Sequence, residues 1–309
     1  MQPLLPIVSA LGPVFALVLL GYLLGRLRFP HAGFWPQAER FTYYLLFPCL
    51  LVLKLGSAQL PAEALARVGL LLVVLLLLSA LLMLLLGRFA GLSAPQQTSL
   101  FQGGIRFNTY VGLASAGALF GDSGLVWGAV FLGIMIPLIN VACVSCFALL
   151  LRGDNEPIWR SVWRGVVKNP LILACLVGGL LNFSGLGIPA PVAPILALIS
   201  GMALPLGLLA VGVGLDLRML QRGGRGLWLA SGFKLLLYPL LLLLLASLIG
   251  IPAEAQRVLL LFALLPTAPS AYILARQLGG DAPLMAAIIT LQTLLAMLTM
   301  PLLLGWYGS

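Results

Sequence analysis

The stretch GGIRFNTYVGLASAG, from Gly103 to Gly117, interrupts a chain that is otherwise dominated by leucine. It places Arg106, Asn108 and Thr109 together in a segment whose flanks have the composition of membrane-spanning helix. A polar break inside an apolar helix is tolerated only where it is buried in protein or lines a water-filled cavity. The segment therefore predicts a broken helix with a polar site at the break.

The composition around this break is that of a membrane protein. The 309-residue chain is 61% hydrophobic and 8% charged, with a mean hydropathy of +1.13, whereas soluble domains carry about 25% charged residues. The formal net charge is +9, but the sequence has no run of five basic residues. This spacing of the basic residues argues against a nucleic-acid partner. The only histidine is His31, so we expect neither a metal site nor a cofactor.

Ten stretches of about 20 mostly apolar residues are long enough to cross a bilayer. They cover residues 4–25, 37–56, 66–88, 95–119, 124–151, 169–186, 192–216, 226–250, 254–277 and 283–306. When these spans alternate in direction, twelve of the 17 Lys and Arg residues fall on one side of the membrane. Because basic residues concentrate in cytoplasmic loops, we expect an all-α polytopic protein with both termini outside.

The two halves of the chain resemble each other. At an offset of 159 residues Asn108 falls on Thr267, and at an offset of 157 the segment FPCLL, with Pro48, falls on LPLGL, with Pro205. Five spans per half is an odd number, so the two copies must lie in opposite orientations, as in many secondary transporters. We expect a first five-helix repeat, a cytoplasmic linker and a second, inverted repeat over residues 1–151, 152–168 and 169–309.

The first break has its counterpart in the ninth span, where LLPTAPSAY contains two prolines. Proline removes a backbone donor and clashes with the preceding turn, so helices four and nine should both break. Two helix N-termini then lie at mid-membrane, where their N–H groups and dipoles favour an anion. The predicted substrate-binding residues are those nearest the breaks: Arg106, Asn108, Thr109, Pro266, Thr267, Pro269, Ser270 and Gln292. The predicted supporting residues are Pro48, Lys54, Asn140 and Pro205.

The charges inside the spans indicate the type of substrate. Arg106 and Lys234 fall within predicted helices, whereas Asp and Glu are expected only at helix ends. A charge at this depth is costly and suggests a function, which here favours an anionic substrate. Two interpretations of Arg106 stay open at this point. It either binds the substrate or is satisfied by carbonyl groups exposed at the break.

These segments resemble the auxin efflux carrier family, which contains the plant PIN proteins and many bacterial permeases. The resemblance is carried by RFNTYVGLASAG (106–117), VVKNPLILACLVGGLL (166–181), LPLGLLAVGVGLDL (204–217) and PTAPSAYILA (266–275). Plant members have a second asparagine where this chain has Thr267, and the long central loop of many plant members is absent. The chain thus resembles the compact bacterial type, which implies a bacterial inner (plasma) membrane.

The resemblance also implies that helices four and nine cross at the substrate site, and it implies a mechanism. Helices one, two, six and seven would form a scaffold, and helices three to five and eight to ten a transport domain that moves as an elevator. The implied substrates are indole-type acids or small mono- and dicarboxylates. The implied assembly is a homodimer in lipid, joined through the scaffold.

Other function classes fit the sequence less well. A sodium-coupled carrier similar to bile-acid symporters is the main alternative. Its oxygen ligands could come from Asn108, Thr109, Asn140, Thr267, Ser270 and Gln292, but the predicted spans offer no carboxylate at mid-membrane. An enzyme would need a nucleophile–base pair, paired aspartates or histidine ligands, for which the predicted spans offer no candidates. The chain also lacks a P-loop motif for ATP. The sequence therefore predicts a secondary transporter of small organic anions.

Overall fold

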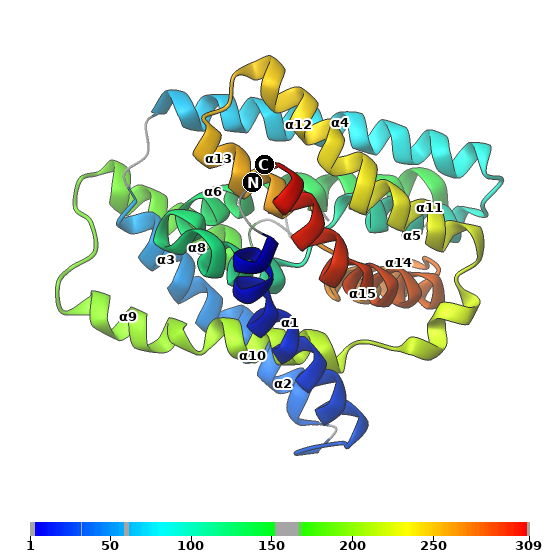
Figure 1. Ribbon diagram of the computed structural model, residues 1–309, viewed down its shortest axis with the longest axis horizontal. Helices are drawn as coiled ribbons and strands as arrows, with labels where there is room; N and C mark the ends of the chain where they lie inside the picture. Colours follow the sequence, from blue (N-terminus) through cyan, green and yellow to red (C-terminus); the bar gives the residue numbers. More distant parts are fainter. Residues whose placement is uncertain (1–3, 32, 59–61, 152–166, 168, 308–309) are drawn as a thin grey trace.

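The computed structural model describes residues 4–31, 33–58, 62–151, 167 and 169–307, and these residues contain helices and no strand (Figure 1). The first half comprises α1 (Leu4–Arg26), α2 (Phe34–Phe41), the π-helical η1 (Thr42–Leu46), α3 (Phe47–Gly56), α4 (Ala62–Phe89), α5 (Ala94–Ile105) and α6 (Thr109–Leu151). The second half begins with α8 (Pro170–Phe183), α9 (Val192–Gly201), α10 (Ala203–Val213) and the 3-10 helix η2 (Leu217–Arg222). It continues with α11 (Gly224–Gly232), the π-helical η3 (Phe233–Leu237), α12 (Tyr238–Ile249), α13 (Ala253–Ala263), α14 (Ser270–Leu278) and α15 (Ala282–Tyr307).

Six helical runs of the described chain are long and apolar enough to cross a membrane. They are Leu4–Arg26, Glu63–Phe89, Ala94–Leu151, Val192–Val213, Gly224–Ile249 and Ala282–Tyr307. An isolated backbone amide has no partner in lipid, so leucine-rich chain of this length folds as helix. The prediction of an all-helical polytopic membrane protein is confirmed. The predicted linker, residues 152–168, lies outside the described residues except for Val167.

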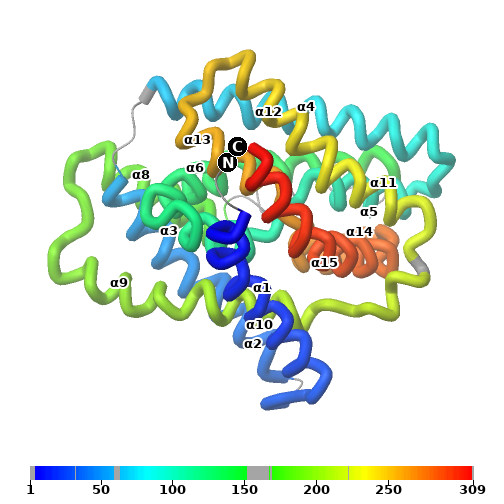
Figure 2. The backbone as a smooth tube through the Cα atoms, viewed as in Figure 1, coloured from blue at the N-terminus to red at the C-terminus, as the bar shows by residue number. Residues whose placement is uncertain are grey.

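The helices pack in two groups that meet at the centre of the molecule. In one group α1 packs against α10, and α3 against α8 and α9. In the other α4 packs against α5 and α12, and α11 against α5 and α15. Figure 1 shows α4 and α12 along one long side and α9 and α10 along the opposite side, with α6 between them and in contact with both groups. Figure 2 traces the blue and red ends of the chain to neighbouring positions, where Gly305 lies against Leu4.

Two interruptions divide helices near the middle of the molecule. Residues 106–108 separate α5 from α6, and residues 264–269 separate α13 from α14. Both lie where the sequence predicted a break. Arg106 was expected inside a helix, but it lies in the first interruption with extended geometry (φ −74°, ψ 157°). A third irregularity is Gly121, whose positive φ of 59° kinks α6 between the predicted fourth and fifth spans.

Glycines allow α1 and α10 to pack with their backbones in contact. A Cβ on Gly212 would lie 1.9 Å from the carbonyl oxygen of Val18, and a Cβ on Gly21 would lie 2.1 Å from that of Leu209. Small residues permit such close approach between membrane helices, where van der Waals packing replaces the hydrophobic effect. The α1–α10 contact therefore requires glycine at both positions.

We predict that Gly212→Ala lowers the thermal stability of the detergent-solubilised protein by about 1–3 kcal/mol, because the added methyl group overpacks the α1–α10 contact. Gly179→Ala is the matched control, since Gly179 lies within α8 and a Cβ there would meet nothing within 4 Å. Replacing glycine by alanine raises the helix propensity in both variants. The difference between their melting temperatures therefore measures the effect of the methyl group on the α1–α10 packing. Equal melting temperatures would contradict the close contact.

Candidate functional site

The first break is a capped junction between two helices. After Arg106 leaves α5, the Asn108 side chain caps α6: its Oδ1 accepts hydrogen bonds from the N–H groups of Tyr110 (3.0 Å) and Val111 (3.3 Å). The first N–H groups of a helix have no partner within the helix, and asparagine is among the side chains best suited to satisfy them. The break therefore keeps its backbone paired although it is buried.

The second break crosses the first, and the two are joined through their backbones. The N–H of Asn108 donates a hydrogen bond to the carbonyl oxygen of Pro266 (2.8 Å). Pro266 and Pro269 have no N–H of their own, so α13 cannot continue through them into α14. Residues 264–269 lie outside both helices, so the Pro266 carbonyl group is free to accept a hydrogen bond from the other break.

Gln292 of α15 ties the two breaks together. Its Oε1 accepts a hydrogen bond from the N–H of Thr267 (2.9 Å), and its Nε2 donates one to the carbonyl oxygen of Gly103 (2.9 Å). The Thr267 hydroxyl lies 2.7 Å from Gln292 Oε1 and 3.0 Å from Gly103 O. Gly103 is in the last turn of α5, so its carbonyl lacks a partner within the helix. Thr267 and Gln292 are both 0% exposed, and in this conformation they hold the crossing together.

Arg106 extends from the first break to two other helices. Its Nη2 donates to Asn140 Oδ1 on α6 (2.6 Å), and its Nη1 lies 3.4 Å from the Ser270 hydroxyl at the start of α14. Its Nε is buried and has no partner among the described residues. Within that part of the chain, no carboxylate lies within 4 Å of the guanidinium. Arg106 therefore brings a positive charge to the crossing that only neutral oxygens surround.

Two adjoining cavities of about 330 and about 230 Å³ form a cleft beside the crossing. Tyr43, Thr109 and Ser270 line both cavities, Asn108 lines the first, and Arg106 lines the second. Because α6 starts at Thr109 and α14 at Ser270, the N-terminal ends of both helices face the cleft. The positive ends of two helix dipoles favour negative charge at this place.

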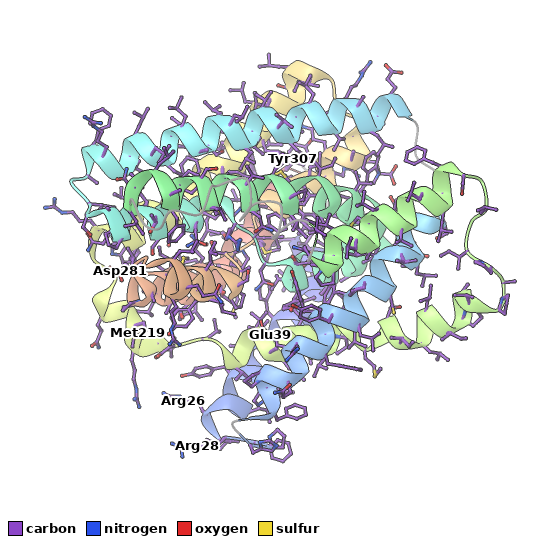
Figure 3. The ribbon with its side chains drawn as sticks, turned by 180° about the vertical axis from the view of Figure 1, so that it is seen from behind. Arg26, Arg28, Glu39, Met219, Asp281 and Tyr307 are labelled. Atoms are coloured by element: carbon purple, nitrogen blue, oxygen red, sulfur yellow. The ribbon has the colours of Figure 1, made fainter. Side chains whose placement is uncertain are left out.

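A larger cavity of about 980 Å³, here called the vestibule, adjoins the cleft. Its lining includes Arg26, Arg28 and Arg218, and Figure 3 shows Arg26 and Arg28 at the edge of the molecule with Glu39 nearer its centre. Glu39 of α2 lines both the vestibule and the cleft. The sequence reasoning missed this carboxylate because the second span was expected to begin at residue 37, whereas α2 begins at Phe34.

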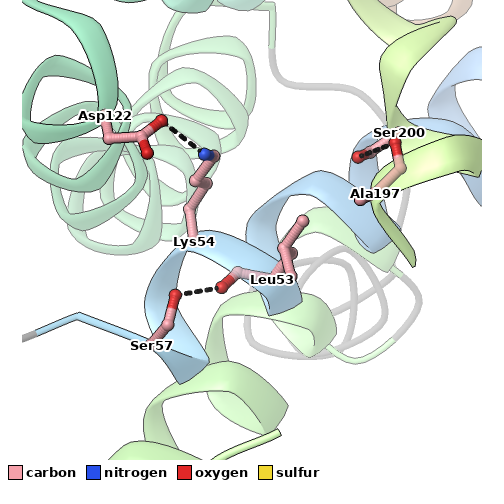
Figure 4. Close-up of polar contacts among 6 residues, drawn as sticks. All are labelled: Leu53, Lys54, Ser57, Asp122, Ala197 and Ser200. Carbon is pink, nitrogen blue, oxygen red and sulfur yellow. Dashed lines mark hydrogen bonds and ion pairs between the residues drawn. The ribbon is translucent and has the colours of Figure 1, made fainter. Parts of the chain in front are cut away.

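Lys54, Pro48 and Pro205 are not among the residues that line the cleft or the vestibule. Lys54 of α3 forms an ion pair of 2.7 Å with Asp122, next to the kink in α6 (Figure 4). The other contacts drawn in Figure 4 each stay within one helix. Pro48 lies in the first turn of α3 and Pro205 in the first turn of α10. The structure thus brings Asn140, but not these three residues, to the crossing.

Comparisons with known proteins indicate the class of protein. Residues 153–304 match the model of a family described as membrane transport protein. A protein named "Uncharacterized transporter" from Methanothermobacter thermautotrophicus is 27% identical over 292 residues, which cover 94% of each chain. The family match over the second half of the chain and this relative together indicate a membrane transporter. A second relative of this transporter, named "Putative malonate transporter" and found in Rhizobium meliloti, is 29% identical over 295 residues, 93% of this chain and 91% of that one. The resemblance to the auxin efflux carrier family is confirmed.

We predict that Gln292→Leu destabilises the transporter by about 1–3 kcal/mol for each buried backbone group that it leaves unpaired. The groups at risk are the Gly103 carbonyl and the Thr267 N–H. Thr293→Val is the matched control, because Thr293 is also buried in α15 but bonds only to Ile289 O of its own helix. Melting temperatures of the purified variants test this, and a Gln292→Leu variant as stable as Thr293→Val would show that Gln292 does not hold the crossing.

Proposed function

We propose that this transporter is a secondary active carrier of small organic anions, which bind in the cleft beside the crossing. The observation that carries the proposal is the state of Asn108. Its Oδ1 is committed to the start of α6, while its Nδ2 is buried and has no partner among the described residues. A buried donor without a partner costs free energy. A carboxylate in the cleft would supply the missing acceptor.

The orientation of the Asn108 amide follows from its hydrogen bonds. Only the oxygen can accept from the N–H groups of Tyr110 and Val111, so the NH₂ group is left to face elsewhere. Asn108 lines the cleft but is 0% exposed, so in this proposal a small movement at the crossing brings the donor to the ligand. The plant-type asparagine at the position of Thr267 has no counterpart here, and Thr267 instead bonds to Gln292. Recognition at the crossing is therefore asymmetric in this proposal.

Arg106 and the two helix N-termini supply the charge complement. The guanidinium lines the same cleft as Ser270 and Thr109, and its bonds to Asn140 and Ser270 fix its position. Arginine can bind a carboxylate through two parallel N–H groups, which adds geometric selectivity to charge. The structural and substrate-binding interpretations of Arg106 are therefore compatible, since an arginine that is held in place is also pre-organised for an anion.

The rest of the cleft favours an anion with an apolar body. Tyr43, Tyr44, Tyr110, Leu171 and Ile273 line its larger cavity, and such surfaces bury aromatic or aliphatic carbon. The name of the Rhizobium meliloti relative makes malonate the first dicarboxylate to test. Indole-3-acetate is the corresponding probe with a large apolar body.

The proposal includes an architecture and a motion. We propose ten spans in two inverted repeats, with α1, α2–α3, α8 and α9–α10 as the scaffold and the remaining helices as the transport domain. The packing supports this division, because α1 contacts α10 and α3 contacts α8 and α9, while α4, α5, α11 and α12 pack together. With the termini outside, the basic vestibule opens to the cytoplasm of a bacterial inner membrane. Elevator-type alternating access and a homodimer remain predictions.

We predict that Arg106→Gln weakens anion binding at least about tenfold and Arg106→Lys weakens it less, because lysine keeps the charge but not the two-pronged geometry. Arg276→Gln is the control, since Arg276 is exposed on α14 and does not line the cleft. Affinity for malonate and indole-3-acetate is measured by isothermal titration calorimetry. If all four proteins bind with equal affinity, Arg106 has only a structural role.

We predict that Asn108→Asp keeps thermal stability close to that of the unchanged protein but abolishes anion uptake into proteoliposomes. Aspartate caps a helix as well as asparagine does, yet it places a negative charge in the cleft and removes the Nδ2 donor. Asn108→Ala should lose the helix cap, which lowers the free energy of unfolding by about 0.5–2 kcal/mol. It should also lose anion uptake. Normal uptake by Asn108→Asp would remove this residue from substrate binding.

A further inference from the structure

Glu39 supplies a carboxylate to the larger cavity of the cleft. It lines both the vestibule and the larger cavity of the cleft, together with Pro269 and Ile273, so it lies where the two spaces join. Asn108 and Thr109 line the same cavity. Within the described residues, the two ion pairs are Lys54–Asp122 and Arg67–Glu63. Glu39 takes part in neither, and no side chain there donates a hydrogen bond to it.

The charged and titratable groups around Glu39 come from six elements or their ends. Those that share a cavity with it are Tyr22 and Arg26 of α1, Arg28 just after α1, Arg40 of its own helix, Tyr43 and Tyr44 of η1, Tyr110 of α6, Asp216 and Arg218 at η2, and Tyr272 of α14. Three of the four arginines line the vestibule. Asp216, the other carboxylate, already accepts a hydrogen bond from the Arg218 N–H (3.0 Å). Of these two carboxylates, only Glu39 also lines the cleft, and it has no ion-pair or hydrogen-bond partner among the described residues.

We propose that Glu39 and the bound anion share one proton, so that the anion binds together with a proton taken up from the vestibule. This inference rests on the proposed function and adds the ion to which anion binding is linked. Two carboxylates in one partly desolvated space repel each other, and one of them must be protonated for both to stay. The proton resides either on Glu39, which then donates an O–H to the substrate, or on the substrate, which donates to Glu39. Both cases take up one proton per anion, and no bond other than the O–H bond is made or broken.

Linkage makes the effect reciprocal. If the anion binds only with a proton, the anion raises the proton affinity of the site by the same factor by which protons raise anion affinity. Affinity should then fall about tenfold per pH unit once the free site has lost its proton. Removal of the Glu39 carboxylate removes the repulsion, so binding no longer depends on proton uptake.

The test measures protons directly. Wild-type protein in detergent is titrated with malonate and with indole-3-acetate at pH 7 in phosphate and in Tris, whose ionisation enthalpies differ, and the difference in heat gives the protons taken up per anion. We expect about one proton for wild type, none for Glu39→Gln, and about one for Glu39→Asp, which retains a carboxylate. Asp216→Asn is the matched control with the other vestibule carboxylate removed, and it should still take up about one proton.

The outcomes separate this inference from the function on which it rests. Wild-type protein that binds an anion without proton uptake overturns the role of Glu39 and leaves anion transport standing. Proton uptake that persists in Glu39→Gln also overturns the role of Glu39. The same holds if proton uptake disappears in Asp216→Asn alone. If wild type binds neither probe, the proposed function fails, and the inference fails with it.

Discussion

A backbone amide inside a bilayer must find its partner within the protein, and a broken helix leaves such groups without partners in its own helix. The hydrogen bond from the Asn108 N–H to Pro266 O joins the breaks directly. Gln292 satisfies Gly103 and Thr267 at the same place. The crossing is therefore stable because each break supplies what the other lacks, and the two helix N-termini are held at fixed positions beside the cleft.

In the proposed function, this arrangement separates structural from substrate-binding roles among residues of similar type. Thr267 and Gln292 are buried, and their polar atoms bond to each other and to backbone groups. The Asn108 Oδ1 accepts from the backbone, whereas its Nδ2 has no partner among the described residues. Arg106 is fixed by Asn140 and Ser270 yet lacks a counter-ion in the described part of the chain. A site built this way has a net positive character at the crossing and a negative one, through Glu39, at its entrance.

The balance between these charges suits a carrier that must release its ligand. An arginine with two helix dipoles alone would hold an anion strongly, and a tightly held ligand slows the cycle. A carboxylate at the junction between vestibule and cleft opposes that attraction in a way that protons can relieve. The opposed charges lie on different helix groups, since Glu39 is on α2 whereas Arg106 follows α5. Relative movement of those groups would change their separation.

Apolar content, span length and proline positions are local properties, so the sequence alone determined that this is a helical membrane protein broken near Asn108 and between Pro266 and Pro269. It also marked Arg106 as a charge that needs an explanation. Only the tertiary structure decided which polar atoms meet: that Gln292 bonds to Gly103, that Lys54 pairs with Asp122 away from the cleft, and that Glu39 faces the cleft. Those outcomes depend on how each helix is rotated about its axis and on where it begins. In a leucine-rich chain all faces of a helix are similarly apolar, so the sequence does not indicate which face is buried.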